Sequence, residues 1–371
     1  MFAKPVSILL VYVVTIFNIV ILATPILAVA TPFISFQNSI IATDYSTFEK
    51  IKFSFALLIF AVSFLMLGYL VLDFLFGFSL RASLKNCVRY EKIKDYDFLT
   101  DVFDQVKNKF GERSVKLYVK NSDEINAYAI SSMGGRAIVL TKGLINHYLV
   151  ECHDPKMFLY ALRSVIGHEM SHLVNKDFLP TFLIITNQKI TNFVSSIMHM
   201  IFSFGVRIFS MLPGSRGTSR VMYDTYNVLN FFITAFNRFI VYNLYEFLRR
   251  FLSRSVEYRC DRQSAKAFGG QNMALALSMM GESGYFTLFS THPRTKMRIK
   301  KVENIKMRDG ITRPGFFDIL SNYFSLMFLI VGCLYFAKQA HVDLMVRSYI
   351  KNHEAINRKV MAFWQFVSHL F

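Results

Sequence analysis

The sequence predicts an α-rich integral membrane protein that also carries a compact α+β domain with a small sheet. Hydrophobic residues make up 53% of the 371 positions and the mean hydropathy is +0.35. Charged residues make up 18%, below the roughly one quarter typical of soluble chains. The apolar residues gather in long runs, whereas the stretch between about residues 90 and 177 has the mixed polarity of a soluble domain. This composition excludes a disordered chain, collagen and a small disulfide scaffold.

Two apolar runs near the N-terminus are long enough to cross a membrane. Val6–Ala30 contains no charged residue, and Phe53–Leu80 contains only Asp73. Each reaches the length of about 20 residues that a spanning helix needs, and a backbone in lipid must be helical to satisfy its own hydrogen bonds. The triplet Ala28-Val29-Ala30 also fits a secretory signal, but the run is too long for one, so an uncleaved anchor is favoured. We therefore expect two transmembrane helices in residues 1–80.

Basic residues after the second run predict the orientation. They are Arg81, Lys85, Arg89, Lys92 and Lys94. The loop between the runs has only Lys50 and Lys52, which are offset by Asp44 and Glu49. By the positive-inside rule, the N-terminus and the residues from Arg81 onward begin on the cytoplasmic side.

Residues 81–177 are expected to form the first part of the soluble domain. The apolar spacing of Phe98–Phe110 predicts a helix, and Asp154-Pro155 predicts the start of another, with a capping residue followed by proline. Three short strands are expected at Val115–Val119, Asn126–Ile130 and Ala137–Leu140, with a turn at Gly134-Gly135.

The remaining apolar segments divide the rest of the chain. Residues 178–251 are expected to form a hydrophobic helical hairpin, either spanning the membrane or lying on its surface, and the membrane-spanning form is favoured. Residues 252–310 would complete the soluble domain. Residues 311–371 form an extension in which the uncharged run Ile319–Ala337 is just long enough for another span.

The sharpest motif is His168-Glu169-Met170-Ser171-His172, in the helix that begins at Asp154-Pro155. Residues four apart share one face of a helix, so both imidazoles can bind one metal ion. Glu169 follows the first histidine, where it can act as general base toward water. The competing interpretation is a histidine pair on an ordinary amphipathic helix, but chance would produce this motif in only about one such sequence in a hundred.

A catalytic zinc site needs a third protein ligand, and Glu257 is the candidate. It lies in Ser253-Arg254-Ser255-Val256-Glu257-Tyr258-Arg259-Cys260-Asp261. Asp261 is four residues further on, so a helix would direct both carboxylates to the site, with Asp261 on the free nitrogen of a ligating histidine. Taken alone, the stretch is a weak signal, because charged residues four apart more often mark a solvated helix face.

Together the motifs resemble the HtpX-like membrane-bound zinc metalloproteases, which are HExxH…E gluzincins related to the CAAX prenyl protease and the mitochondrial Oma protease. The Glu257 stretch resembles the family string S-R-x-x-E-Y-x-A-D, with Cys260 in place of alanine. Asn126-Ala127-Tyr128-Ala129 resembles its N-A-F-A strand, and Thr291-His292-Pro293 followed by Arg298-Ile299 resembles its T-H-P…R-I element. The resemblance covers roughly residues 1–305, and the extra apolar run after it departs from the usual pattern.

The resemblance implies a zincin-like α+β metallopeptidase domain with one Zn²⁺ per chain. It implies metal ligation by His168, His172 and Glu257, a supporting role for Asp261, and catalysis by Glu169, with His292 as oxyanion donor. Asn126, Ala127 and Tyr128 would bind the backbone of an extended substrate by β-augmentation. The expected function is endoproteolysis in the quality control of misfolded membrane proteins. A catalytically silent scaffold and a prenyl-protein processing protease remain as alternatives.

The expected partners are polypeptide substrates and the lipid bilayer. The formal charge of +17 gathers at the ends of the apolar runs, so anionic headgroups explain it better than nucleic acid does. The four cysteines are far apart and indicate no disulfide framework. The resemblance suggests a bacterial inner membrane, with the active site facing the cytoplasm.

Overall fold

The computed structural model of the chain describes residues 47–132, 135–212, 216–236, 242–281 and 293–342, together with residues 13, 239, 344 and 346. The helices are α2 (Thr47–Phe76), α3 (Phe78–Ser83), α4 (Phe98–Phe110), α5 (Lys142–Glu151), α6 (Pro155–Val174), α7 (Phe178–Phe209), α8 (Arg216–Phe236), α9 (Tyr242–Phe268), α10 (Gly270–Met279), α11 (Thr295–Val302) and α12 (Phe316–Gln339). The strands are β1 (Cys87–Arg89), β2 (Lys116–Lys120), β3 (Ala127–Ser132) and β4 (Gly135–Thr141), and two 3₁₀ turns cover Tyr90–Lys92 and Lys94–Tyr96.

The chain divides into two compact units, which we describe separately. So far as they are described, segments 66–188 and 237–327 belong to the first unit, and segments 15–65, 189–236 and 328–371 belong to the second. The first unit contains the whole sheet and the expected metal-binding residues.

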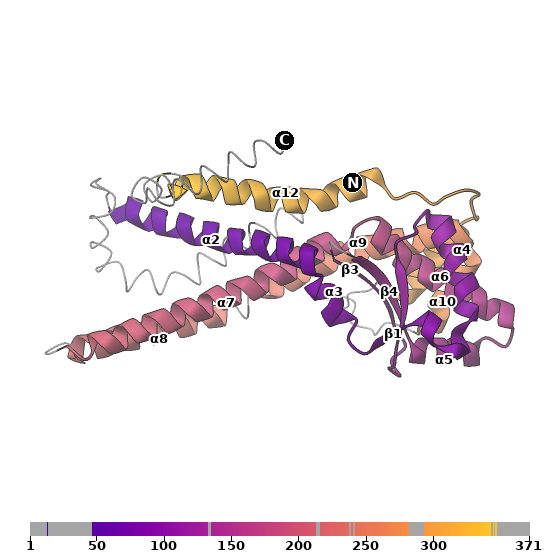
Figure 1. Ribbon diagram of the computed structural model, residues 1–371, viewed down its shortest axis with the longest axis horizontal. Coiled ribbons are helices and arrows are strands. Elements are labelled where there is room, and N and C mark those ends of the chain that lie inside the picture. Colours follow the sequence, from indigo (N-terminus) through magenta and orange to yellow (C-terminus); the bar gives the residue numbers. More distant parts are fainter. Residues whose placement is uncertain are drawn as a thin grey trace, which may run out of the picture. The chain divides into compact units, whose positions relative to one another are not determined.

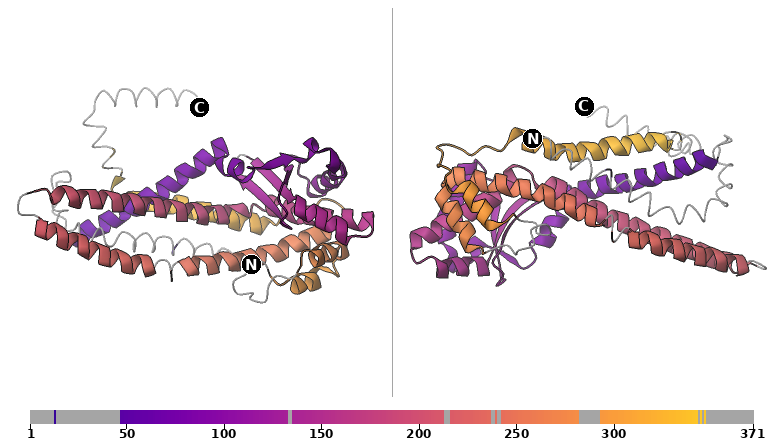
Figure 2. Two further views of the ribbon diagram at one scale, coloured as in Figure 1. Left: turned by 90° about the horizontal axis from the view of Figure 1, so that it is seen from below. Right: turned by 180° about the vertical axis from the view of Figure 1, so that it is seen from behind.

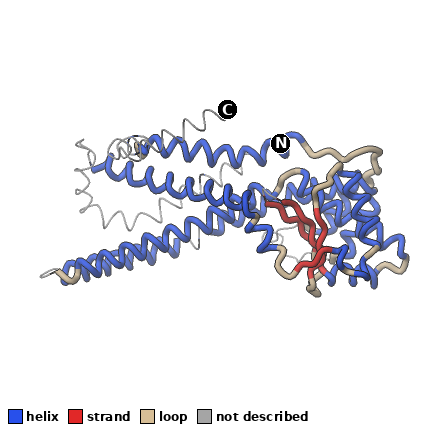
Figure 3. Tube along the Cα trace, viewed as in Figure 1, coloured by secondary structure: helices blue, strands red, loops and turns tan. Residues whose placement is uncertain are grey.

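A small mixed sheet organises the first unit. Its strand order is β1-β2-β4-β3, with β2 and β4 parallel and the two outer pairs antiparallel. Helix α6 packs on β3 and β4, while α4, α9 and α10 pack against α6 (Figures 1 and 2). Figure 3 shows the strands, drawn in red, as a twisted sheet next to these helices. The core between sheet and helices buries Leu117, Ile138 and Leu140 of the strands together with Leu162 and Ile166 of α6.

Most of the predicted local elements are confirmed. Helix α4 has the predicted bounds, and its five buried apolar side chains follow helical spacing. Helix α6 begins at Pro155, and Asp154 caps it by accepting a hydrogen bond from the Lys156 backbone N–H at 2.9 Å. The three predicted strands, β2, β3 and β4, begin within two residues of their predicted starts, whereas β1 was not predicted. Of the predicted glycine turn, Gly135 begins β4 and Gly134 lies outside the described residues.

Two helices of the described chain are long and apolar enough to span a membrane. They are Phe55–Phe76, within α2, and Phe316–Gln339, which is α12. Among the described residues neither α7 nor α8 meets the same criterion, and the predicted run Val6–Ala30 lies outside them. The second predicted run ends as a helix at Phe76, because Gly77 takes the left-handed conformation that separates α2 from α3.

The expected hairpin appears as two long antiparallel helices, α7 and α8, which lie side by side in Figures 1 and 2. In the second unit, the buried Tyr226 of α8 stacks on Phe202 and hydrogen-bonds His199, both from α7. Helix α9 then runs without a break across residue 251, where the sequence suggested a domain boundary.

A close approach of α6 and α9 sets the position of the metal-binding residues. A Cβ on Gly167 would lie 2.7 Å from the Phe268 ring and 3.0 Å from Ser264 Oγ, so only glycine allows this helix separation. Ser264 Oγ also donates to the carbonyl of Ser164 at 2.6 Å. Since Gly167 directly precedes His168, the contact brings α9 against the first histidine of the motif.

Candidate metal centre

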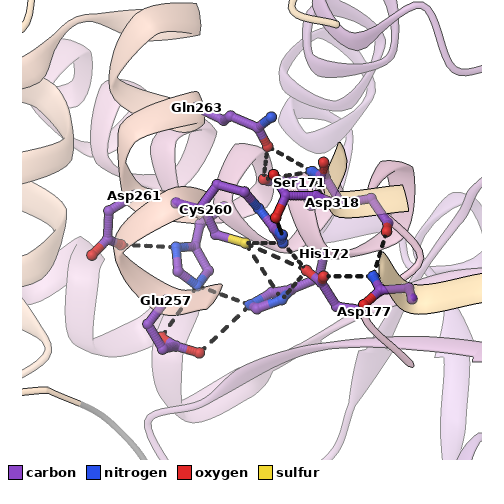
Figure 4. Close-up of polar contacts among 12 residues, drawn as sticks. Ser171, His172, Asp177, Glu257, Cys260, Asp261, Gln263 and Asp318 are labelled. Atoms are coloured by element: carbon purple, nitrogen blue, oxygen red, sulfur yellow. Dashed lines mark hydrogen bonds and ion pairs between the residues drawn. The ribbon is translucent and has the colours of Figure 1, made fainter. Parts of the chain in front are cut away.

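Three electron-rich groups converge between α6 and α9. His168 Nε2 lies 3.2 Å from His172 Nε2 and 3.5 Å from one carboxylate oxygen of Glu257. His172 Nε2 lies 3.6 Å from the other oxygen of Glu257. Ligand atoms around a tetrahedral zinc ion, at bond lengths of about 2.0–2.2 Å, lie about 3.3–3.6 Å apart. The three groups therefore have the spacing of three corners of a zinc site. Figure 4 shows Glu257 and His172 pointing toward each other.

The opposite nitrogens of both imidazoles face carboxylates. His168 Nδ1 lies 2.9 Å from an oxygen of Asp261, and His172 Nδ1 lies 3.2 Å from Asp177 Oδ2. A carboxylate accepts hydrogen bonds, so we assign the proton of each neutral ring to Nδ1. Each Nε2 then carries a lone pair directed at the other ring and at Glu257. Such an arrangement of acceptors requires a cation between them, either a metal ion or added protons.

Arg298 of α11 joins the two carboxylates of α9. Its guanidinium donates to both oxygens of Asp261, at 2.7 and 2.6 Å, and lies 3.2 Å from Glu257. All three side chains are less than a tenth exposed. This fork holds Asp261 in the orientation that faces His168. The sequence analysis quoted Arg298 as part of the R-I element but assigned it no role.

The pKa values of the two imidazoles reflect the negative charge around them. Burial lowers the pKa of His168, but Asp261 and Glu257 outweigh burial and raise it to about 10. Burial likewise lowers the pKa of His172, and the neighbouring Cys260, Asp177 and Glu169 outweigh burial, so the net shift is upward. Burial raises the pKa of Asp261, but Arg298 and His168 outweigh that effect and lower it. In both imidazoles, excess negative charge dominates the effect of burial.

A second cluster, His172, Asp177 and Cys260, has ligand atoms within 4.8 Å of one another. Arg259 contacts two of the three candidate ligands of this cluster. The Nη2 of Arg259 donates to Asp177 Oδ2 and lies 3.7 Å from Cys260 Sγ. A guanidinium already supplies the positive charge at that place. We therefore interpret the cluster as a set of side chains that orient His172 and not as another metal site.

The other predicted site residues are placed less centrally. Glu169 is buried next to His168 on α6. Asn126 is exposed just before β3, and its backbone N–H donates to Thr141 Oγ1 at 3.1 Å. Ala127 and Tyr128 begin β3, which is an edge strand of the described sheet. Burial raises the pKa of Tyr128 to about 12. His292 lies outside the described residues.

Asp177 is the residue that sequence reasoning missed. It follows the C-terminal end of α6, five positions after His172, and no helical periodicity links it to the motif. The Asp177 backbone N–H donates to the His172 carbonyl at 3.2 Å, which folds the chain back toward the ring. A carboxylate within a few residues of the second histidine was the available signal.

Comparison with known proteins places the chain in a family. Residues 99–306 match Peptidase_M48, described as peptidase family M48, which is more than half of the chain. The chain belongs to peptidase family M48. A protease HtpX homolog of Thermoplasma acidophilum is 32% identical over 84 residues, which are 22% of this chain and 24% of the relative. A crystal structure of S. mikatae Ste24p superposes with a TM-score of 0.37 and 16% identity, over 74% of this chain and 63% of that one.

The chain thus spans about a quarter of the HtpX homolog and less than two thirds of the Ste24p chain. The matched region includes α4 to α11 and ends before α12. It contains every residue of the candidate metal centre named so far, including the missed Asp177 and Arg298.

Proposed function

We propose that this protein is a membrane-bound, zinc-dependent endopeptidase that hydrolyses peptide bonds in polypeptide substrates. The observation that carries the proposal is the triangle of His168 Nε2, His172 Nε2 and a Glu257 carboxylate, with sides of 3.2 to 3.6 Å. Two nitrogens and one carboxylate are the donor set of a zinc site that leaves a fourth position open. The metal would be one Zn²⁺ ion per chain.

A bound zinc ion would supply Lewis acidity toward the scissile carbonyl and toward water. Glu169, next to the first ligand and held on the rigid helix α6, would take a proton from the attacking water and return it to the departing amine. Asp261 and Asp177 keep each imidazole in the tautomer that leaves Nε2 free. Arg298 keeps Asp261 in place.

The edge strand β3 would hold the substrate. An extended peptide can add to an exposed strand edge through main-chain hydrogen bonds, which tolerate many side-chain sequences. Asn126 lies just before that strand, and Ala127 and Tyr128 begin it. A protease that accepts many substrate sequences is suited to the quality control of misfolded membrane proteins. The two candidate membrane helices are consistent with substrates in the membrane. The role of His292 as oxyanion donor remains a prediction from the sequence.

The location we propose is a bacterial inner membrane with the active site on the cytoplasmic side. Support comes from the basic residues Arg81, Lys85 and Arg89, which follow the candidate span Phe55–Phe76 directly. The catalytic part of the chain begins just after them.

Replacing Glu169 by glutamine tests the proposal. The full chain, purified in detergent, is assayed for zinc content and for casein cleavage beside two other variants. Glu169→Gln keeps both imidazoles, so zinc should remain while hydrolysis falls by about 10²–10⁴-fold. Glu257→Ala should lose zinc and activity together. Glu151→Gln, on the exposed end of α5, is the matched control and should change neither.

Casein cleavage that persists in Glu169→Gln, after contaminating protease is excluded, would contradict the mechanism. Full zinc retention by Glu257→Ala under chelator challenge would mean that another residue is the third ligand. Zinc binding without any hydrolysis by the unmodified chain would favour the catalytically silent scaffold.

A further inference from the structure

The chain beyond the family match docks on the metalloprotease domain. Backbone N–H groups of residues 308–315 reach back to three separate elements. Arg308 donates to the carbonyl of Lys266, Thr312 to that of Lys109, and Gly315 to Asn175 Oδ1, at 2.8, 2.7 and 3.0 Å. Helix α12 therefore begins in a defined place beside the C-terminal end of α6.

Asn322, in the second turn of α12, is completely buried. Its amide nitrogen donates to the Asn175 carbonyl at 2.8 Å and to Asp177 Oδ1 at 3.2 Å. Asp177 Oδ2 is the atom that faces His172 Nδ1 at 3.2 Å. One carboxylate thus joins the first turns of α12 to a ring of the metal centre.

Asp318 reaches the same carboxylate through Arg259. Asp318 Oδ1 lies 2.9 Å from Arg259 Nη1, and Arg259 Nη2 donates to Asp177 Oδ2. Figure 4 labels Asp318, Asp177 and His172 in one group of polar contacts. Both oxygens of Asp177 are therefore held, Oδ1 by Asn322 and Oδ2 by Arg259.

Simple packing would not require these side chains. Helix α12 is otherwise apolar enough to span a membrane, and a polar side chain in such a helix costs free energy unless a partner satisfies it. An apolar residue at 322 would anchor the helix at lower cost. A carboxylate that is held at its far oxygen, however, cannot rotate away from the imidazole it orients, and this orientation supports metal affinity.

We propose that Asn322 and Asp318, at the start of α12, are positioning residues for His172 and act through Asp177. The inference deepens the proposed function, because it takes His172 to be a zinc ligand. Both residues lie outside the part of the chain that the family match covers. The C-terminal helix would thereby contribute to zinc affinity as well as to anchoring.

The experiment measures zinc dissociation constants of the full chain by competition with a fluorescent chelator. All variants carry Glu169→Gln, so that self-cleavage cannot interfere. Asn322→Ala should weaken zinc binding by about 3- to 10-fold, less than the 10- to 100-fold typical of a direct imidazole partner. Ser321→Ala is the matched control, because Ser321 is buried on the same helix and donates only to the Asp318 carbonyl in the contacts described.

A double-mutant cycle distinguishes positioning from general destabilisation. In a chain that also carries Asp177→Ala, replacing Asn322 should change zinc affinity by less than about twofold, because the route to His172 is already lost. The cobalt-substituted protein gives a spectroscopic check, since its visible absorption reports ligand geometry. Asn322→Ala should shift that spectrum and Ser321→Ala should not.

Asp318→Asn, which keeps the side-chain shape, serves if Asn322→Ala does not fold, and it should weaken zinc binding in the same direction. Unchanged zinc affinity and cobalt spectrum in the folded variants would overturn the inference, whatever their melting temperatures. So would an equal loss of affinity in the presence and absence of Asp177. If the unmodified chain binds no zinc, the proposed function and this inference both fail. If zinc affinity depends on Asn322 but the chain hydrolyses no peptide bond, the proposed function fails and this inference stands.

Discussion

At the scale of single residues, charge balance dominates the metal centre. Four carboxylates gather there, from Glu169, Asp177, Glu257 and Asp261, and two guanidiniums, from Arg259 and Arg298. Asp318, which pairs with Arg259, adds a fifth carboxylate, so negative charge exceeds positive charge around the two imidazoles. A metal ion or protons on the imidazoles offset this excess, which is why both histidine pKa values are raised.

Zinc binding should therefore release protons and become tighter as pH rises. The pKa of His168 is raised to about 10, and the pKa of His172 is also raised. Zinc needs neutral rings, so its binding must release protons. Calorimetric titrations at pH 7 in buffers of different ionisation enthalpy should detect them.

The same raised pKa values make a matching prediction for stability. A histidine whose pKa in the folded chain lies above its unfolded value of about 6.5 stabilises the metal-free fold. The stabilisation is fully present below about pH 6.5 and is lost as the pH rises through the pKa of the folded chain. The metal-free chain should thus melt at lower temperature at pH 9.5 than at pH 7. Zinc affinity that does not vary between pH 7 and pH 9 would contradict this account of the site.

At the scale of elements, the positions of α9 and α11 decide where the carboxylates and Arg298 lie. Residues 253–261 looked ambiguous as sequence, since charges four apart also suit a solvated face. In the fold that part of α9 packs against α6, and α11 packs on α9 and α10. The carboxylates at 257 and 261 consequently point into the protein, and the neighbouring Arg262 is exposed.

Gly270→Ala should test the packing of α10 against α11. A Cβ at position 270 would lie 2.1 Å from the carbonyl oxygen of Val302, and backbone atoms cannot yield as a side-chain end can. Overpacking of this kind costs about 1–3 kcal/mol, partly offset by the better helix propensity of alanine. A lower melting temperature and weaker zinc binding should follow, because the displaced helix carries Arg298. Gly68→Ala, with open space around its Cβ, is the control, and equal stability of the two variants would contradict the prediction.

At the scale of the whole molecule, the distribution of basic residues predicts the topology. Arg81, Lys85 and Arg89 follow the span Phe55–Phe76, whereas Lys50 and Lys52 precede it beside acidic residues. A reporter fused after Arg89 should behave as cytoplasmic, and one fused near Asp44 as external. The opposite labelling would reverse the orientation and place the metal centre outside.

What the sequence determined by itself is local. The histidine motif, the start of α6 at Asp154-Pro155 and the bounds of α4 all follow from spacing and capping within one element. Glu257 and Asp261 could be proposed because a matching family string supplemented an otherwise weak pattern.

Only the tertiary structure decided which partners hold the imidazoles. Asp177 lies beyond a helix end, five positions after His172. Arg298 of α11 and Asn322 of α12 reach partners that are 37 and 145 positions away in the sequence. Periodicity carries information about faces within an element and none about contacts between elements. These polar groups meet because α6, α9 and the docked start of α12 bury them together, and a buried charge must find a partner.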